Sequence, residues 1–265
     1  MKNIQLDKNR LTLISGPCVL ESVKHAIFMA KEIKSRCDDL DIQHIFKVSW
    51  DKANRTALDH YRGYPLDEAI DMFREIKSEA DVLITTDFHE SWQAEKLKDV
   101  VDVLQIPAFL CRQTDMLVCA SRTGLPVNVK KAQFISAEDT EKVVDKVKQS
   151  GNSEVWLTER GNIFGYGNYV VDMRNLVIMK QFAPVIFDAT HSVQQGAKGG
   201  SSGSQREFIE PLAKAAVSVG VDGIFMEVHD NPDEALSDGT SSLDLRDLTP
   251  LLKKLKKLYE INNTL

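Results

Sequence analysis

Eight short β-rich apolar runs recur along the chain, and each run carries, at or near its end, side chains that are able to do chemistry. Amphipathic segments separate the runs, so the pattern alternates between strand and helix eight times. The runs are LTLISGPC, HIFKVSW, VLITTD, VLQIP, PVNVKK, EVWLTER, PVIFDATH and IFMEVHD. This alternation predicts an α/β fold, a (β/α)8 TIM barrel, in which the carboxyl ends of all eight strands meet on one face.

Length and composition agree with one such barrel. The chain has 265 residues, and a (β/α)8 barrel needs about 250. No Pro- or Ser-rich linker interrupts the rhythm, so residues 1–265 are expected to form a single catalytic domain. The sequence shows no signal peptide, no run of about 18 apolar residues and no C-x-x-C spacing among its four cysteines. These features predict a cytoplasmic protein that does not enter membranes.

The distribution of charge points to a small anionic substrate. A formal net charge of −6 argues against nucleic-acid binding. Basic residues nevertheless follow or end several of the expected strands, and they are Lys47, Lys52, Arg55, Lys130 and Arg160. Any one of them is readily explained as a solvated surface charge, but their recurrence at strand ends favours a basic pocket in an acidic protein.

Long polar segments follow the second, seventh and eighth runs. They are DKANRTALDHYRGYP, GAKGGSSGSQ and HDNPDEALSDGTSSLDL. Loops of this length are uncommon in compact domains unless they are functional or disordered. All three leave the predicted carboxyl-end face, so we expect long loops there that act as lids over a site, with mobile surface loops as the alternative.

Four side chains predict a metal site at one corner of this face. Cys18, His191 and Glu227 end the first, seventh and eighth runs, which are neighbours once a barrel closes, and Asp238 follows in the last loop. A thiolate, an imidazole and two carboxylates suit one divalent ion such as Zn²⁺, Fe²⁺ or Mn²⁺. The alternative is a small buried cysteine beside a hydrogen-bonded histidine.

Other polar residues leave more than one function open. Lys47 or Lys130 is a candidate Schiff-base nucleophile, as in barrel aldolases. His89 and Glu90 are equally well explained as supporting or helix-capping residues. A barrel that binds phosphosugars without turnover is a third possibility, although so many charged groups are costly to assemble where nothing reacts.

Seven motifs make the chain resemble the 3-deoxy-D-manno-octulosonate 8-phosphate synthases, also called 2-dehydro-3-deoxyphosphooctonate aldolases, almost end to end. The motifs are SGPCVLES, FKVSWDKANRT, LQIPAFLCRQTD, VNVKKAQF, WLTERG, FDATHSVQQ and MEVHDNPDEALSDG. The KANR segment is the most diagnostic, because the related 3-deoxy-7-phosphoheptulonate synthases typically have K-P-R-T there. The resemblance implies condensation of phosphoenolpyruvate with D-arabinose 5-phosphate and water, in lipopolysaccharide precursor biosynthesis. Heptulosonate synthesis from erythrose 4-phosphate is the alternative.

The resemblance also implies roles for individual residues. The phosphoenolpyruvate set would be Lys47, Lys52, Gln105, Lys130 and Arg160, and the pentose-phosphate set Asn54, Arg55 and Thr56. Lys47, Lys52, Asn54 and His191 would take part in the chemistry. Arg112 would reach into a neighbouring subunit, which implies a homotetramer.

Three positions bear on how closely the chain follows this family. Cys18 resembles the metal-dependent class, whose metal-independent counterparts have asparagine there, and ALSDG around Asp238 resembles the same class. Thr56 replaces a family serine, and HYRGYP departs from the commoner S-Y-R-G-P-G. The expected metal set is therefore Cys18, His191, Glu227 and Asp238, whereas the sequence names neither the ion nor its role.

Overall fold

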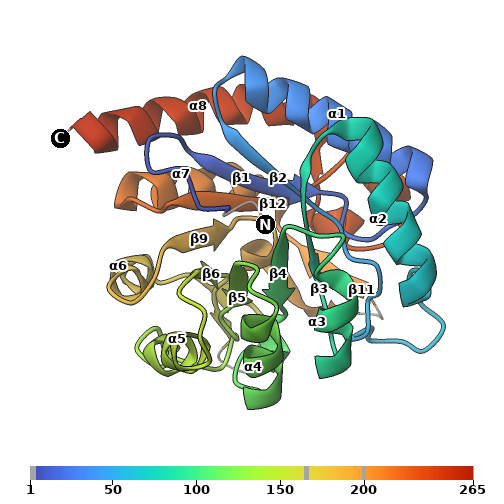
Figure 1. Cartoon of the computed structure of the whole chain (residues 1–265). Coiled ribbons are helices and arrows are strands. Elements are labelled where there is room, and N and C mark those ends of the chain that lie inside the picture. The colour runs from blue at the N-terminus through green and yellow to red at the C-terminus, as the bar shows by residue number, and fades with distance from the viewer. Residues whose placement is uncertain (1–3, 164–166, 199–200, 265) are drawn as a thin grey trace.

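The computed structural model describes residues 4–163, 167–198 and 201–264, and within them eight parallel strands close into a barrel (Figure 1). In order around the barrel these strands are β1 (Thr12–Gly16), β2 (Gln43–Lys47), β3 (Leu83–Asp87), β4 (Val103–Ile106), β5 (Val127–Lys130), β6 (Val155–Glu159), β9 (Val185–Asp188) and β12 (Gly223–His229). Pairing of β12 with β1 closes the barrel. The (β/α)8 barrel predicted from the eight apolar runs is confirmed.

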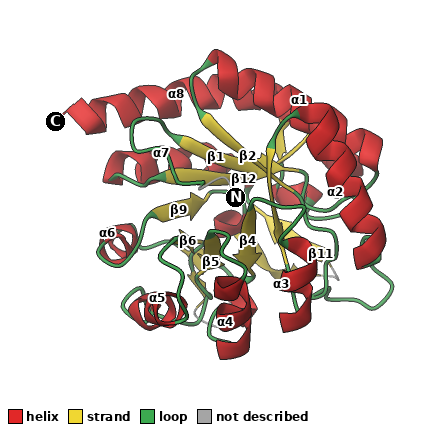
Figure 2. Cartoon of the chain, viewed as in Figure 1, coloured by secondary structure: helices red, strands yellow, loops and turns green. Residues whose placement is uncertain are grey.

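Helices surround the strands, as Figure 2 shows by its ring of red ribbons around yellow arrows. They are α1 (Val23–Asp39), α2 (Leu66–Ala80), α3 (Ser91–Leu97), α4 (Thr114–Arg122), α5 (Thr140–Gln149), α6 (Arg174–Lys180), α7 (Ile209–Val219) and α8 (Leu245–Thr264). Local chemistry sets their starts: the Ser22 side chain accepts the His25 N–H at α1, and Asp244 accepts the Arg246 N–H at α8. None of the helices in the described part of the chain is long and apolar enough to cross a membrane.

The interior of the barrel is apolar toward the amino ends of the strands. Side chains from six of the eight barrel strands form one cluster, made of Ile14, Ile45, Val103, Trp156, Ile186 and Phe225. Ile4 and Leu6, from the segment before β1, pack against this cluster. Apolar side chains thus fill the barrel toward the amino ends of the strands, and the polar residues at the carboxyl ends lie on the other side of this layer.

The predicted long loops contain short elements of their own. After β2, an antiparallel bridge joins Asp51 to Gly63, whose φ of 122° and close approach to the Trp50 carbonyl leave no room for a Cβ. After β9, the glycine-rich segment forms a hairpin of β10 (Gln194–Lys198) and β11 (Ser201–Ser204), while Gly199 and Gly200 lie outside the described residues. After β12, the chain returns as β13 (Leu243–Asp244), parallel to β12.

The remaining short strands lie after β6. β7 (Asn162–Ile163) and β8 (Tyr169–Val170) form a small antiparallel pair above the barrel wall. An isolated bridge from Asn168 to Gln195 connects this pair with the β10–β11 hairpin. Loops that leave the same face of the barrel are therefore tied to one another.

Candidate active site

A cavity of about 500 Å³ opens at the carboxyl ends of the strands. Its lining includes every predicted substrate-binding residue except Arg112, namely Lys47, Lys52, Asn54, Arg55, Thr56, Gln105, Lys130 and Arg160. His191, Glu227 and Asp238 of the predicted metal set line it as well. The expectation that strand ends gather these side chains agrees with the geometry.

Two lysines meet at one hydroxyl group on the β2 side of the cavity. The Lys47 ammonium donates to Ser49 Oγ at 2.8 Å, and the Lys52 ammonium donates to the same oxygen at 3.0 Å. Burial disfavours the charge of Lys52, but Cys18 and nearby carboxylates raise its pKa above the ordinary value. Sequence reasoning missed Ser49, although its place two residues after Lys47 is the signal that puts both on one side of a strand.

Asp87, at the end of β3, compensates these cations. Its Oδ1 lies 3.4 Å from Lys47 Nζ, and its Oδ2 lies 3.2 Å from His89 Nε2. Burial would raise the pKa of Asp87, but Lys47 and His89 hold it well below its usual range. His89 therefore supports a buried carboxylate, and Glu90 forms a capping box with Gln93 at the start of α3.

A second buried pair lies on the opposite side of the barrel. Lys130 Nζ donates to Asp188 Oδ2 at 2.6 Å and lies 3.7 Å from the centre of the Phe225 ring. Burial lowers the pKa of Lys130, whereas Asp188 acts in the other direction. The pKa of Asp188 is held well below its usual range against burial, because His191 and Lys130 both contact it.

Asp188 also orients His191. Its Oδ2 lies 2.7 Å from His191 Nδ1 and accepts from it, so the opposite ring nitrogen, Nε2, carries the lone pair. His191 Nε2 faces Glu227 Oε1 at 3.7 Å and Asp238 Oδ2 at 3.9 Å. A carboxylate that fixes the ring in this way is the usual arrangement behind a histidine that binds a metal.

The predicted metal ligands fit a divalent ion by their chemistry. Cys18 Sγ lies 3.1 Å from Asp238 Oδ2, and Glu227 is buried with its Oε2 lacking a hydrogen-bond partner among the described residues. Burial and the neighbouring Asp238 raise the pKa of the Cys18 thiol. Two carboxylates and an imidazole lone pair thus converge beside a thiol, a set that a thiophilic cation would stabilise. Asp238 is held there in the left-handed conformation, with φ 49°.

A tighter group of possible metal ligands lies beside this corner and was only partly anticipated. Within the described residues, the ligand atoms of Glu21, His25 and His229 all lie within 4.8 Å of one another, which makes them a possible metal site. Two of them pair with each other, since His229 Nε2 lies 3.4 Å from Glu21 Oε1, while His25 Nε2 lies 2.9 Å from Oδ1 of the adjacent Asp230. His229 and Asp230 end the eighth apolar run, IFMEVHD, and so fall at the predicted mouth, but His25 on α1 carried no visible signal.

Two loop arginines of the predicted substrate-binding set, Arg55 and Arg112, lie differently. Arg55 lines the cavity and ties two loops together, because its Nε donates to the Tyr61 carbonyl at 2.7 Å and its guanidinium to the Leu236 carbonyl at 3.2 Å. Arg112 is exposed and does not line the cavity. The described chain therefore does not bring Arg112 into the cavity.

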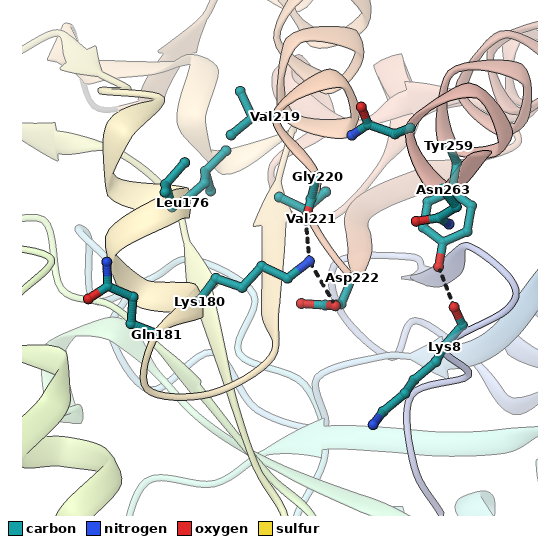
Figure 3. Close-up of a pocket in the computed structure, with 12 residues that line it drawn as sticks. Lys8, Leu176, Lys180, Gln181, Val219, Gly220, Val221, Asp222, Tyr259 and Asn263 are labelled. Atoms are coloured by element: carbon teal, nitrogen blue, oxygen red, sulfur yellow. Dashed lines mark hydrogen bonds and ion pairs between the residues drawn. The ribbon is translucent and has the colours of Figure 1, made fainter. Parts of the chain in front are cut away.

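A second hollow, of about 610 Å³, lies between α6, α7 and α8 (Figure 3). Its charged lining is sparse: Lys180 binds the Gly220 carbonyl and Asp222, and Lys8 lies across from them. No predicted site residue lines it. The catalytic candidates are therefore concentrated at the carboxyl ends of the strands.

Comparisons with known proteins cover nearly the whole chain. The sequence profile described as the DAHP synthetase I family matches residues 3–264. A protein of Koribacter versatilis named 2-dehydro-3-deoxyphosphooctonate aldolase is 53% identical over 264 residues, which cover 98% of this chain and 95% of that protein. Proteins of the same name from Geobacter metallireducens and Campylobacter jejuni subsp. doylei are each 51% identical, covering 98% and 96% of this chain and 96% and 98% of their own lengths.

Proposed function

The chain belongs to the DAHP synthetase I family, and from the names of its relatives within that family we propose that it condenses phosphoenolpyruvate with D-arabinose 5-phosphate and water. The products are 3-deoxy-D-manno-octulosonate 8-phosphate and inorganic phosphate. The chain is thus an aldol-type synthase that forms a C–C bond, since relatives 50–53% identical to it carry the name 2-dehydro-3-deoxyphosphooctonate aldolase. Those names favour this reaction over heptulosonate synthesis from erythrose 4-phosphate.

The observation that best supports this function is the cationic clamp inside the cavity. Lys47 and Lys130 are buried at opposite sides of the barrel mouth, and Arg160 joins them from the end of β6. Three fixed cations bind the phosphate and the carboxylate of phosphoenolpyruvate at once, which no single surface charge does. Asp87 and Asp188 pair with the two lysines, so the side chains of the clamp are held in place before substrate arrives.

The clamp positions the enol phosphate for attack on the aldehyde. C3 of phosphoenolpyruvate forms the new bond to the aldehyde carbon of the open-chain pentose, water adds at C2, and the hemiketal phosphate loses phosphate by C–O cleavage. Lys130 and Arg160 stabilise the phosphate oxygens as charge develops. Asn54, Arg55 and Thr56 line the loop side of the cavity, where the pentose phosphate would bind.

Cys18, His191, Glu227 and Asp238 would hold one divalent metal ion at the corner of the cavity, with Lys52 nearby. Such an ion orients an aldehyde oxygen or lowers the pKa of a bound water. Asp188 fixes the ring of His191 through Nδ1, and Ser237 Oγ lies 3.0 Å from Cys18 Sγ. These contacts position both ligands before any ion binds.

We further propose a cytoplasmic homotetramer that serves lipopolysaccharide precursor biosynthesis. The exposed Arg112 follows β4 near the mouth of the cavity but does not line it, which suits a residue that completes a neighbouring copy's site. Sedimentation of the purified protein gives the mass of the assembly. An Arg112→Ala variant that lowers affinity for arabinose 5-phosphate in an intact assembly supports this arrangement, whereas a fully active monomer excludes it.

The function is tested by initial phosphate release from phosphoenolpyruvate with each of two aldoses. We expect release with arabinose 5-phosphate to exceed that with erythrose 4-phosphate, and the reverse order would assign the alternative function. Thorough chelation followed by addition of Zn²⁺ or Mn²⁺ tests the metal separately. Activity that is lost on chelation and restored by the ion supports the predicted metal site at Cys18. Unchanged activity after chelation would mean that the reaction does not need the ion. Borohydride trapping of an adduct on Lys47 or Lys130 would instead indicate a Schiff-base aldolase.

A further inference from the structure

One side chain, that of Gln194, connects the cationic clamp with the predicted metal site. Gln194, at the start of β10, accepts a hydrogen bond from the Arg160 guanidinium through Oε1 at 2.8 Å. Its Nε2 donates to Asp238 Oδ1 at 3.4 Å. Gln194 lines the same cavity, and neither the sequence motifs nor the proposed mechanism assigns it a role.

The orientation of this amide follows from its two partners. A guanidinium only donates and a carboxylate only accepts, so the carbonyl end must face Arg160 and the amino end must face Asp238. A glutamate at this position would repel Asp238, and an apolar side chain would bind neither partner. Only a side chain that has an acceptor and a donor at its tip bridges a cation to an anion without carrying charge itself.

The two carboxylate oxygens of Asp238 have different partners. Oδ1 accepts from Gln194, while Oδ2 faces Cys18 Sγ at 3.1 Å and His191 Nε2 at 3.9 Å. The 3₁₀ turn from His191 to Val193 leads directly into Gln194, and the His191 carbonyl also accepts from Arg160 at 3.4 Å. Arg160 therefore contacts both the backbone of one predicted metal ligand and, through the amide, the side chain of another.

We propose that Gln194 is a positioning residue that couples anion binding at Arg160 to cation binding at Asp238. This inference rests on the proposed function, because it takes Arg160 as part of the phosphoenolpyruvate site and Asp238 as a metal ligand. The amide holds the carboxylate with one oxygen turned toward the metal corner, so a cation there fixes the far end of the bridge. Phosphoenolpyruvate then binds an Arg160 that is already aligned, and each ligand strengthens the binding of the other.

Equilibrium binding without aldose tests the coupling, because no turnover occurs. Titration calorimetry measures the phosphoenolpyruvate Kd of chelated and of Zn²⁺-loaded protein, and the ratio of the two is the coupling factor. We expect the coupling factor of the wild type to be roughly fivefold or more, since fivefold is the lower end of usual couplings between sites. Gln194→Met keeps the length of the side chain but removes both hydrogen bonds, and we expect it to reduce the factor to about twofold or less.

Gln195→Met is the matched control, since the Gln195 side chain makes no hydrogen bond to Arg160 or Asp238 among the described residues. We expect it to keep the wild-type factor. If Gln194→Met folds poorly, Gln194→Asn replaces it, because asparagine retains the amide but is one methylene too short to span both partners. A Gln194 variant that keeps the full factor, or a wild type with no coupling, overturns the inference and leaves the function intact. A wild type that binds no phosphoenolpyruvate contradicts the proposed function itself.

Discussion

Two lysine–aspartate pairs at opposite ends of the barrel have the same chemistry and different surroundings. Lys130 and Asp188 meet at 2.6 Å in the mouth, with side chains 7% and 0% exposed. Lys180 and Asp222 meet at 3.2 Å in the hollow of Figure 3, with side chains 47% and 30% exposed. Water screens the second pair but not the first.

The difference shows where the fold concentrates electrostatic energy. A buried pair that loses one partner leaves an unpaired charge in a low dielectric, whereas an exposed charge that loses its partner is simply solvated. The apolar layer that includes Trp156 and Phe225 keeps the mouth of the barrel at low dielectric, so a charge that loses its partner there is left unpaired and unsolvated. Charges there are consequently fixed in place before a substrate binds, as catalysis by preorganised groups requires.

The largest effect is expected from Lys130→Met. Removing the ammonium leaves Asp188 buried without its cation, so we expect a stability loss of about 3 kcal/mol and a fall in kcat of roughly 10²–10³-fold. Urea unfolding and phosphate release measure the two effects. The double variant Lys130→Met/Asp188→Asn should recover much of the stability but none of the activity. Loss of stability that the second substitution does not restore would contradict the role of the buried charge.

Cys18→Asn should chiefly affect the metal corner. The amide is a poor replacement for a thiolate ligand, so we expect affinity for Zn²⁺ to fall by about 100-fold or more, beyond what loss of a supporting residue usually costs. Metal content after dialysis measures the change, and Cys37→Ala, a buried cysteine on α1, is the control. Unchanged metal content in Cys18→Asn would refute the ligand assignment and direct attention to Glu21, His25 and His229.

His44 is a buried ionisable group whose pKa is governed mainly by burial. Burial in β2 lowers its pKa to about 4, while an unfolded histidine titrates near about 6.5. The unfolded state alone therefore takes up a proton as the pH falls through this window, and stability decreases. Between about pH 7 and about pH 5 we expect His44 to account for a loss of about 2 kcal/mol. His44→Gln should remove that part of the pH dependence in urea unfolding, and an unchanged slope would exclude it.

The sequence predicted the barrel and most of its mouth because both depend on local pattern. An apolar run that ends on Lys47 or Asp188 states which residue lies at the end of a strand, and parallel strands bring those ends together. The cavity contains the side chains that this rule selects. Whether these side chains and the metal ligands act as proposed stays a prediction that the experiments above address.

Contacts that depend on loop conformation could not be predicted in this way. Gln194 bridges Arg160 and Asp238 only because a 3₁₀ turn and a left-handed Asp238 bring two loops together. The ring of His25, near the start of α1, contacts the ring of His229, at the end of β12, across about two hundred residues of sequence. The glycine-rich segment after β9 was expected to be a long loop, yet its flanks pair as β10 and β11. Backbone pairing between two strands is not encoded in composition.

The smallest effect is expected from Lys180→Met at the other end of the barrel. Asp222 keeps a hydrogen bond from the Val185 N–H at 2.8 Å and has access to water, so the lost pair should cost less than about 1 kcal/mol. Phosphate release should match the wild type, which makes this variant the lysine-to-methionine control for Lys130→Met. Added salt should narrow the stability difference further, since screening weakens an exposed pair. A destabilisation comparable to that of Lys130→Met would mean that exposure does not separate the two pairs, and that the contrast between mouth and hollow has another cause.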